Sequence, residues 1–447
     1  MDRCKSVCLA VSLVMGMMLM AHPVCAQTQR PAPARPYRSL FGSTDASRPS
    51  LHALDLTLSI NGAADNGLAP PASAENPTPQ LGFQQLYSAV AQLNYVMRGR
   101  RFSGDAGGSA TVPRYTGSAD QLSTLGYGAN AGLSFRSVVT SARAYGSYVY
   151  SPYYAPGLDA ATAPAPSAPL FDYASARSPY DQTMTGASLT RRLGRRTSAT
   201  LGYSYNNMWF ENGDQSNQSQ DARISADRQM SRSLTVRGSY AYREAQYVTA
   251  GAPTANTTTS HDIDLGFGYN RTLPRRQAAS LDLSLGSSIV SDAFVQQRAL
   301  WRGSARASGP VGAGWTIGGS ISRSLQFNSV VLQPVVADVA NVDVSGVFRR
   351  RVTVTFAGAY SNGQGQTQGT QRFKIYSGST RVQFGLASYA AINVQYINYY
   401  YDFPPGYQLP EGVPVRTNRQ RVQIGASFWL PIARAGRAGD SRSPASQ

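Results

Sequence analysis

The strongest constraint on this chain is an alternation of apolar and polar residues that repeats along most of its length. In 54–60, leucine or isoleucine fills every second position, and Asp, Thr and Ser lie between them. Successive side chains of a strand point to opposite faces, so this period of two predicts strands with one apolar and one polar face. Similar segments lie at 201–205, 234–242, 263–269, 281–285, 352–360 and 422–428. No segment has the period of an amphipathic helix, and we therefore predict an all-β chain.

The connections between these segments are of two kinds, and the two kinds alternate. Short turns such as 98–101 and 193–196 are rich in arginine, whereas 62–83, 151–178 and 404–414 are long and polar or rich in Pro and Gly. Short periplasmic turns and longer external loops are typical of outer-membrane barrels. We therefore predict a transmembrane antiparallel β-barrel of about 18 strands with periplasmic termini. Weak alternation in 104–111 and 333–341 leaves this number open by two.

The N-terminus has the features of an export signal. Arg3 and Lys5 precede an apolar run at 7–20, and small residues precede Gln27. We expect four parts in the chain, which are a signal peptide at 1–26, a proline-containing disordered periplasmic leader at 27–50, the outer-membrane barrel at 51–430 and a basic C-terminal tail at 431–447.

Charge and cysteine content restrict the chemistry of the mature chain. Cys4, Cys8 and Cys25 all lie in the expected signal, so disulfides and thiolate metal sites are not expected. The net charge of +17 is carried almost wholly by arginine. These arginines are spread along the chain and concentrate at turns, which favours membrane-surface and lumen chemistry over nucleic-acid binding.

The polar positions of the strands are predicted to line the lumen. Barrels of about 16 to 18 strands are wide enough for an aqueous channel, and the expected leader is too short for a plug domain. A channel with an excess of arginine is therefore expected, while cross-linking of a filled lumen by ion pairs stays open as the alternative. The candidate lumen residues are Arg223, Asp227, Arg237, Arg243, Asp262, Asp264, Asp282, Arg302, Arg306, Arg381, Arg419 and Arg421.

Aromatic residues collect beside the long connections. Tyr and Trp favour membrane interfaces, where an amphipathic ring has one wet end. We therefore expect an outer aromatic belt formed by Tyr148, Tyr150, Trp209, Phe210, Tyr247, Tyr399, Tyr400 and Tyr401.

Few residues suit catalysis. Beyond the expected signal, the histidines are His52 and His261, and neither has a second metal ligand at a suitable spacing. His261 beside Asp262 would give a base and its orienting group for a membrane hydrolase, but an ordinary polar strand end is the stronger interpretation. The acidic residues Glu211, Asp214 and Asp221 lack the order of a calcium loop. We expect no enzyme, no catalytic or metal-binding residue and no cofactor.

One strand and turn pattern resembles a known type of protein. The turn at 193–197 followed by Leu201, Tyr203 and Tyr205 resembles a family of poorly characterised outer-membrane β-barrels associated with exopolysaccharide synthesis and export. The resemblance covers about 51–430 and contains no catalytic signature. It implies an outer membrane of Gram-negative type and, as partners, periplasmic polysaccharide-export components.

Further partners follow from the expected barrel. Its surface would contact outer-membrane lipid and lipopolysaccharide. Phe428 and Trp429 end a last strand of the kind that barrel-assembly machinery recognises. The expected function is a porin-like outer-membrane channel, with export of an extracellular polysaccharide as the more specific form. The alternative is a structural or adhesion barrel that displays surface loops without transport.

Overall fold

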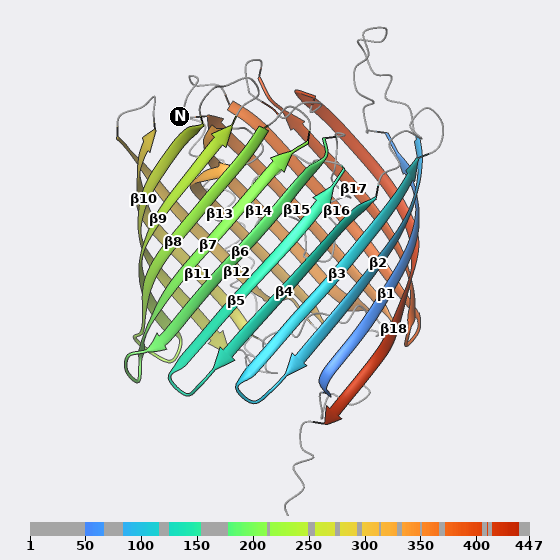
Figure 1. Cartoon of the computed structure of the whole chain (residues 1–447), viewed down its shortest axis with the longest axis horizontal. Helices are drawn as coiled ribbons and strands as arrows, with labels where there is room; N and C mark the ends of the chain where they lie inside the picture. The colour runs from blue at the N-terminus through green and yellow to red at the C-terminus, as the bar shows by residue number, and fades with distance from the viewer. Residues whose placement is uncertain are drawn as a thin grey trace, which may run out of the picture.

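The fold is a single antiparallel sheet of 18 strands that closes on itself (Figure 1). The structure is a computed structural model, and it describes residues 50–66, 84–115, 125–152, 178–211, 215–248, 255–272, 278–292, 297–312, 314–328, 333–348, 351–365, 372–404, 409 and 414–437. The strands are β1 (Ser50–Asp65), β2 (Gln84–Arg98), β3 (Phe102–Tyr115), β4 (Gly126–Arg136), β5 (Thr140–Ser151), β6 (Tyr180–Arg192), β7 (Thr197–Phe210), β8 (Gln215–Gln229), β9 (Leu234–Val248), β10 (Asn256–Thr272), β11 (Ala278–Asp292), β12 (Arg298–Pro310), β13 (Trp315–Asn328), β14 (Gln333–Phe348), β15 (Val352–Gly365), β16 (Arg372–Ala387), β17 (Ala390–Asp402) and β18 (Arg416–Arg437). Across these ranges, no helix is long and apolar enough to cross a membrane.

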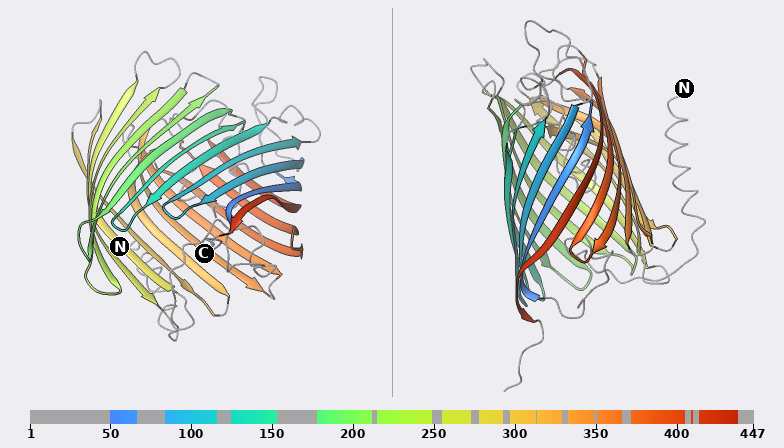
Figure 2. Two further views of the ribbon diagram at one scale, coloured as in Figure 1. Left: turned by 60° about the horizontal axis from the view of Figure 1, so that its bottom comes forward. Right: turned by 90° about the vertical axis from the view of Figure 1, so that its right-hand side faces the viewer.

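The sheet is a closed ring because its first and last strands pair. β1 is hydrogen-bonded to β2 on one side and to β18 on the other, and every other strand pairs with its neighbours in sequence (Figures 1 and 2). Closure lets the backbone satisfy its own hydrogen bonds in lipid, where no water can do so. The expected barrel is confirmed, and both poorly patterned segments form strands, β3 and β14.

The alternation in sequence becomes an outer and an inner face. On β18, Val422 and Ile424 are exposed on the outside, while Arg421 and Gln423 between them are buried on the inside. The large exposed apolar side chains of β10 and β11 likewise share the outward side, with Leu265 opposite Leu285. A closed barrel with an apolar exterior is the form in which strands cross bacterial outer membranes. The chain is an outer-membrane β-barrel.

The two ends of the barrel differ. Tight turns join the strands at one end, where the Gly99 N–H donates to the Phe102 carbonyl and the Ser137 N–H donates to that of Thr140, each at 2.7 Å. In the turn between β12 and β13, Gly312 and Gly314 have positive φ angles of 65° and 86°, which favour glycine. We call this the turn end, which faces the periplasm, and the opposite end, with the longer connections, the outer end.

The last strand extends beyond the boundary expected from the sequence. β18 continues to Arg437, seven residues into the segment expected as a tail, and pairs there with β1. Proline has no N–H to donate and is tolerated at irregular points of a sheet. Pro431 lies opposite Asp55, where the register shifts. The expected signal peptide and all but one residue of the expected leader lie outside the described residues.

Candidate functional site: the barrel lumen

A chain of alternating charges crosses one wall of the lumen. Arg243 lies 2.8 Å from Asp221 and 3.2 Å from Asp262. Arg302 pairs with Asp262 and lies 3.0 Å from Asp264. These five residues come from four strands, β8, β9, β10 and β12, and we call them the ladder. Asp262 is fully buried, and its two arginine partners offset the cost of burying its charge.

A glycine lets the ladder cross β11. Gly286 lies between Asp264 and Arg302 in the register, so the ion pair spans a strand that has no side chain at that point. A Cβ on Gly286 would clash with the Asp264 Oδ1 and with the Ile263 carbonyl oxygen. Any larger residue at this position would therefore push β10 and β11 apart.

The ladder continues toward the turn end with side chains that water reaches. Arg237 pairs with Asp227 at 2.5 Å, and Arg223 donates to the Ser239 hydroxyl at 2.9 Å. Asp282 and Arg306 face each other in the register and are both exposed. Exposed charges on the inner face indicate a water-filled lumen at this depth.

The opposite wall, on β16, β17, β18 and β1, is richer in arginine. Arg381 donates to Gln395 at 3.0 Å, and Arg419 donates to Asp65 at 3.0 and 3.1 Å. Arg421 lies beside Gln423 and is buried. The Arg419 guanidinium and the Asp65 carboxylate form an ion pair that is buried from solvent. The two walls together give the lumen a lining of mixed charge.

The sequence prediction placed twelve residues in the lumen, and the strand registers put all twelve on the inward side. Asp65 and Asp221 were missed, although both are strand residues on the inward side. From the sequence, Asp221 is considered together with Glu211 and Asp214 as a possible calcium loop, but β8 begins at Gln215 and contains Asp221. Gly286 was also missed, because its role depends on which residues lie opposite it.

The expected aromatic belt divides into two groups. Four members have the outward parity, and they are Tyr148, Tyr150, Trp209 and Tyr400. The centre of the Tyr127 ring lies 6.1 Å from that of Tyr148 and 5.1 Å from that of Tyr150. Neighbouring residues of a strand point to opposite faces, so a run such as 399–401 cannot lie wholly on one face. The remaining members are buried inside the barrel, and they are Phe210, Tyr247, Tyr399 and Tyr401.

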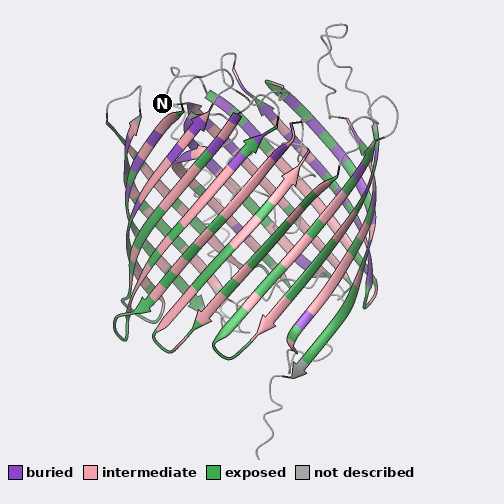
Figure 3. Ribbon diagram, in the orientation of Figure 1, coloured by how far each residue is buried: buried purple, intermediate pink, exposed green. Residues whose placement is uncertain are grey.

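Those inward aromatic residues narrow the outer end of the lumen. Phe210, Tyr399 and Tyr401 belong to a contiguous apolar cluster that joins β6 and β7 to β14, β16 and β17 across the lumen. Tyr247 packs instead with Ala245 and Phe327. Figure 3 shows buried residues gathered at this end. The cluster contains Tyr180, Met208, Phe210, Val335, Ala337, Val339, Phe373, Ile375, Ile397, Tyr399, Tyr401 and Phe403. We call it the mouth cluster.

The outer part of β13 folds into this mouth. The pairing of β12 with β13 runs from Pro310 opposite Thr316 to Gly303 opposite Arg323 and stops there, although β13 continues to Asn328. Leu325 packs with Val290 of β11, and the Arg243 guanidinium donates to the Leu325 carbonyl at 3.4 Å.

The parity of β13 shows that this segment has left the wall. Ile321 is exposed toward lipid, and Leu325 and Phe327 have the same parity, yet both pack inside the barrel. Phe327 contacts the cluster of Ala245 and Tyr247 on β9. We call the segments 324–328 and 333–338 the inner hairpin. It covers the lumen between the ladder and the mouth cluster.

The turn end of the lumen is less filled. Tyr145 faces inward over Gly186, where a Cβ would lie 2.5 Å from its ring, and it is 40% exposed. The Arg143 guanidinium lies 5.9 Å from the centre of the Tyr145 ring and is also exposed. Among the described residues, the inner face is therefore more exposed to solvent near the turn end than at the mouth cluster.

The hydrolase alternative does not fit the structure. His261 points outward and its Nδ1 is 2.8 Å from the Tyr240 hydroxyl, whereas Asp262 points into the lumen and pairs with arginines. Because the two residues lie on opposite faces of β10, Asp262 cannot orient the His261 ring. Within the described ranges, no group of three or more His, Cys, Asp or Glu is placed to hold a metal ion.

Comparison with known proteins finds similarity at the level of structure. OpdQ of Pseudomonas aeruginosa is 10% identical, with a TM-score of 0.45 over 86% of this chain and 99% of that one. OccAB4 of Acinetobacter baumannii is 12% identical, with a TM-score of 0.42 over 85% and 98%. The siderophore receptor PirA of P. aeruginosa is 7% identical, with a TM-score of 0.41 over 86% and 81%. No protein-family model and no curated protein matches the sequence.

Proposed function

We propose that this protein is an outer-membrane channel for small anionic solutes, narrowed at its outer end by the inner hairpin and the mouth cluster. The observation that carries the proposal is the set of water-exposed arginines on the inner face of a closed 18-strand barrel. A barrel of this strand number is wide enough for an aqueous path.

Fixed charges on the inner face support the proposed preference for anions. Arg143 and Arg223 are exposed on the inner face, and their field would raise the local concentration of anions, while the exposed carboxylates Asp105, Asp282 and Asp343 on the same face limit this excess. The ladder, by contrast, compensates most of its charge internally. Screening limits the reach of each charge to about 10 Å at 0.1 M salt, so the preference should weaken as ionic strength rises.

The test is the reversal potential of the purified protein in planar bilayers under a salt gradient. We expect greater permeability to chloride than to potassium, and we expect Arg143→Gln together with Arg223→Gln to lower this ratio severalfold. Arg228→Gln is the matched control, because Arg228 lies on β8 like Arg223 but points outward. A cation-selective pore, or a ratio that the lumen variants leave unchanged, contradicts the proposal.

A second candidate is passage of an extracellular polysaccharide. It is supported by Tyr145, whose ring faces the lumen and is 40% exposed. Aromatic faces of this kind suit the apolar faces of sugar rings. Block of the current by oligosaccharides, weakened by Tyr145→Ala, would support this candidate, and no block at millimolar concentration would contradict it.

A further inference from the structure

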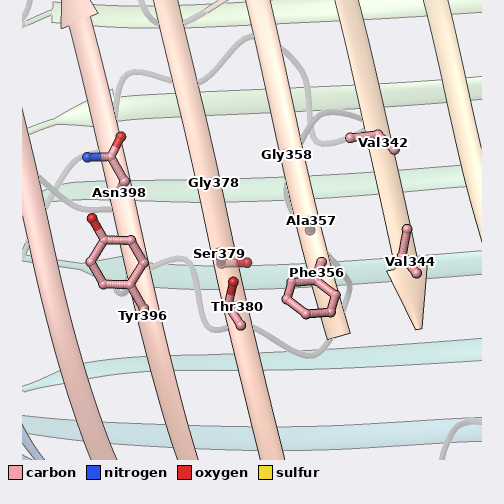
Figure 4. Close-up of a pocket in the computed structure, with 10 residues that line it drawn as sticks. All are labelled: Val342, Val344, Phe356, Ala357, Gly358, Gly378, Ser379, Thr380, Tyr396 and Asn398. Carbon is pink, nitrogen blue, oxygen red and sulfur yellow. The ribbon is translucent and has the colours of Figure 1, made fainter. Parts of the chain in front are cut away.

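The lipid-facing wall carries a groove on β14 to β17. Its floor is formed by Gly358 and Gly378, which lie opposite each other on β15 and β16. Figure 4 shows the larger side chains around it, including Val342, Phe356 and Tyr396. The groove has a volume of about 310 Å³. These residues have the outward parity, so the groove opens toward the membrane and not toward the lumen.

A row of tyrosines lies next to the groove on its outer side. Tyr360, Tyr376 and Tyr400 are opposite one another on β15, β16 and β17, and all three have the outward parity. Their ring centres are 5.0 Å apart for the first pair and 5.8 Å apart for the second. Tyrosine rings favour the level where lipid headgroups meet hydrocarbon. The groove therefore lies just below the headgroup level of the outer leaflet.

Cationic residues lie beyond the tyrosines on the same strands. Lys374 and Arg372 on β16 and Arg416 on β18 are exposed and point outward, and the Arg416 guanidinium lies 5.7 Å from the centre of the Tyr400 ring. Asp402 lies between Lys374 and Arg416 in the register, so the patch keeps a positive excess. Lys374 is four residues from Gly378, or about 13 Å along the strand. Cations, tyrosines and groove thus form three levels on one face.

We propose that this face binds a phosphorylated, acylated glycolipid of the outer leaflet, of the lipid A class. Its phosphate would contact Lys374, Arg372 and Arg416, because arginine and lysine bind phosphate through charge-assisted hydrogen bonds. One acyl chain would lie over the tyrosine row and enter the groove at Gly358 and Gly378. Its hydrocarbon would fill the space that these two glycines leave, because glycine has no side chain. A second copy of the chain fits the face less well, since its own cations would repel these.

The test measures lipid A retained by the protein after extraction in mild detergent, using native mass spectrometry. We expect one strongly retained lipid A per wild-type barrel. Retention should fall about tenfold in the double variant Lys374→Gln with Arg416→Gln, and also in Gly378→Leu, which fills the groove. The control for the groove is Gly238→Leu, because Gly238 also points outward and a Cβ placed on it would have nothing within 4 Å.

Wild-type protein supplies an independent measurement. Added bisphosphorylated lipid A should bind at least tenfold more tightly than its dephosphorylated form. Equal binding of the two forms, or wild-type retention in both the cation and the groove variants, overturns the proposal. A wild-type oligomer that Gly378→Leu dissociates without loss of lipid A also overturns it, since a second copy would then occupy the groove. This inference does not depend on the proposed transport function.

Discussion

At the scale of single residues, neighbouring positions have opposite environments. Leu285 is 66% exposed and lies in the outward band, whereas Ser284 next to it points into the lumen and bonds the Ser304 hydroxyl at 2.7 Å. Gly266 lies opposite Ser284 and leaves space on the inner face. The two positions share a depth in the membrane and differ only in face.

This difference predicts the effect of a charge at each position. Leu285→Arg should destabilise the barrel by about 2 to 4 kcal/mol, because it places a cation against hydrocarbon near the middle of the membrane. Ser284→Arg should cost about 1 kcal/mol or less, since its guanidinium reaches water and only one hydroxyl contact is lost. Urea unfolding in lipid vesicles measures both values. Equal costs, or a larger cost for Ser284→Arg, would contradict this assignment of the inner and outer faces.

At the scale of strands, the inner hairpin departs from the regular wall, because its β13 segment loses the pairing with β12 while its β14 segment stays paired with β15. Residues 324–328 continue the alternation of the rest of β13. From sequence alone, Leu325 would therefore be assigned to the lipid-facing side. Alternation predicts which residues share a face but not whether a strand end remains paired with its neighbour. The sequence therefore predicted the strand and could not predict that its outer part folds into the lumen.

The packing of the inner hairpin predicts how the mouth opens. Leu325→Ala together with Phe327→Ala removes its apolar contacts with β9 and β11 and should raise single-channel conductance or open probability severalfold. Ile321→Ala is the control on the same strand and parity, because Ile321 remains in the wall. Heat-modifiable migration on gels checks that each variant is folded. Unchanged conductance in the folded double variant would mean that the inner hairpin does not obstruct the path.

At the scale of the whole molecule, strand number and closure were predictable from the sequence, since turns and long connections alternate along the chain. The inward side of Arg302 was also predictable from its parity. Its partners Asp262 and Asp264 were not, because an ion pair across strands depends on the register between them and on Gly286 in the intervening strand. The mouth cluster is harder still to predict from the sequence, because it joins strands on opposite sides of the barrel.

The central claim is that the barrel encloses water within the membrane, and thiol labelling tests it most directly. The sequence beyond residue 25 has no cysteine, so a single introduced thiol reports its own surroundings. Ser304 points into the lumen, and Ala305 points outward between Leu283 and Ile321. In lipid vesicles, a small charged maleimide should react with the Ser304→Cys variant and leave Ala305→Cys unmodified. Reaction at Ala305→Cys alone, at both positions equally, or at neither would contradict a membrane barrel with a water-filled lumen.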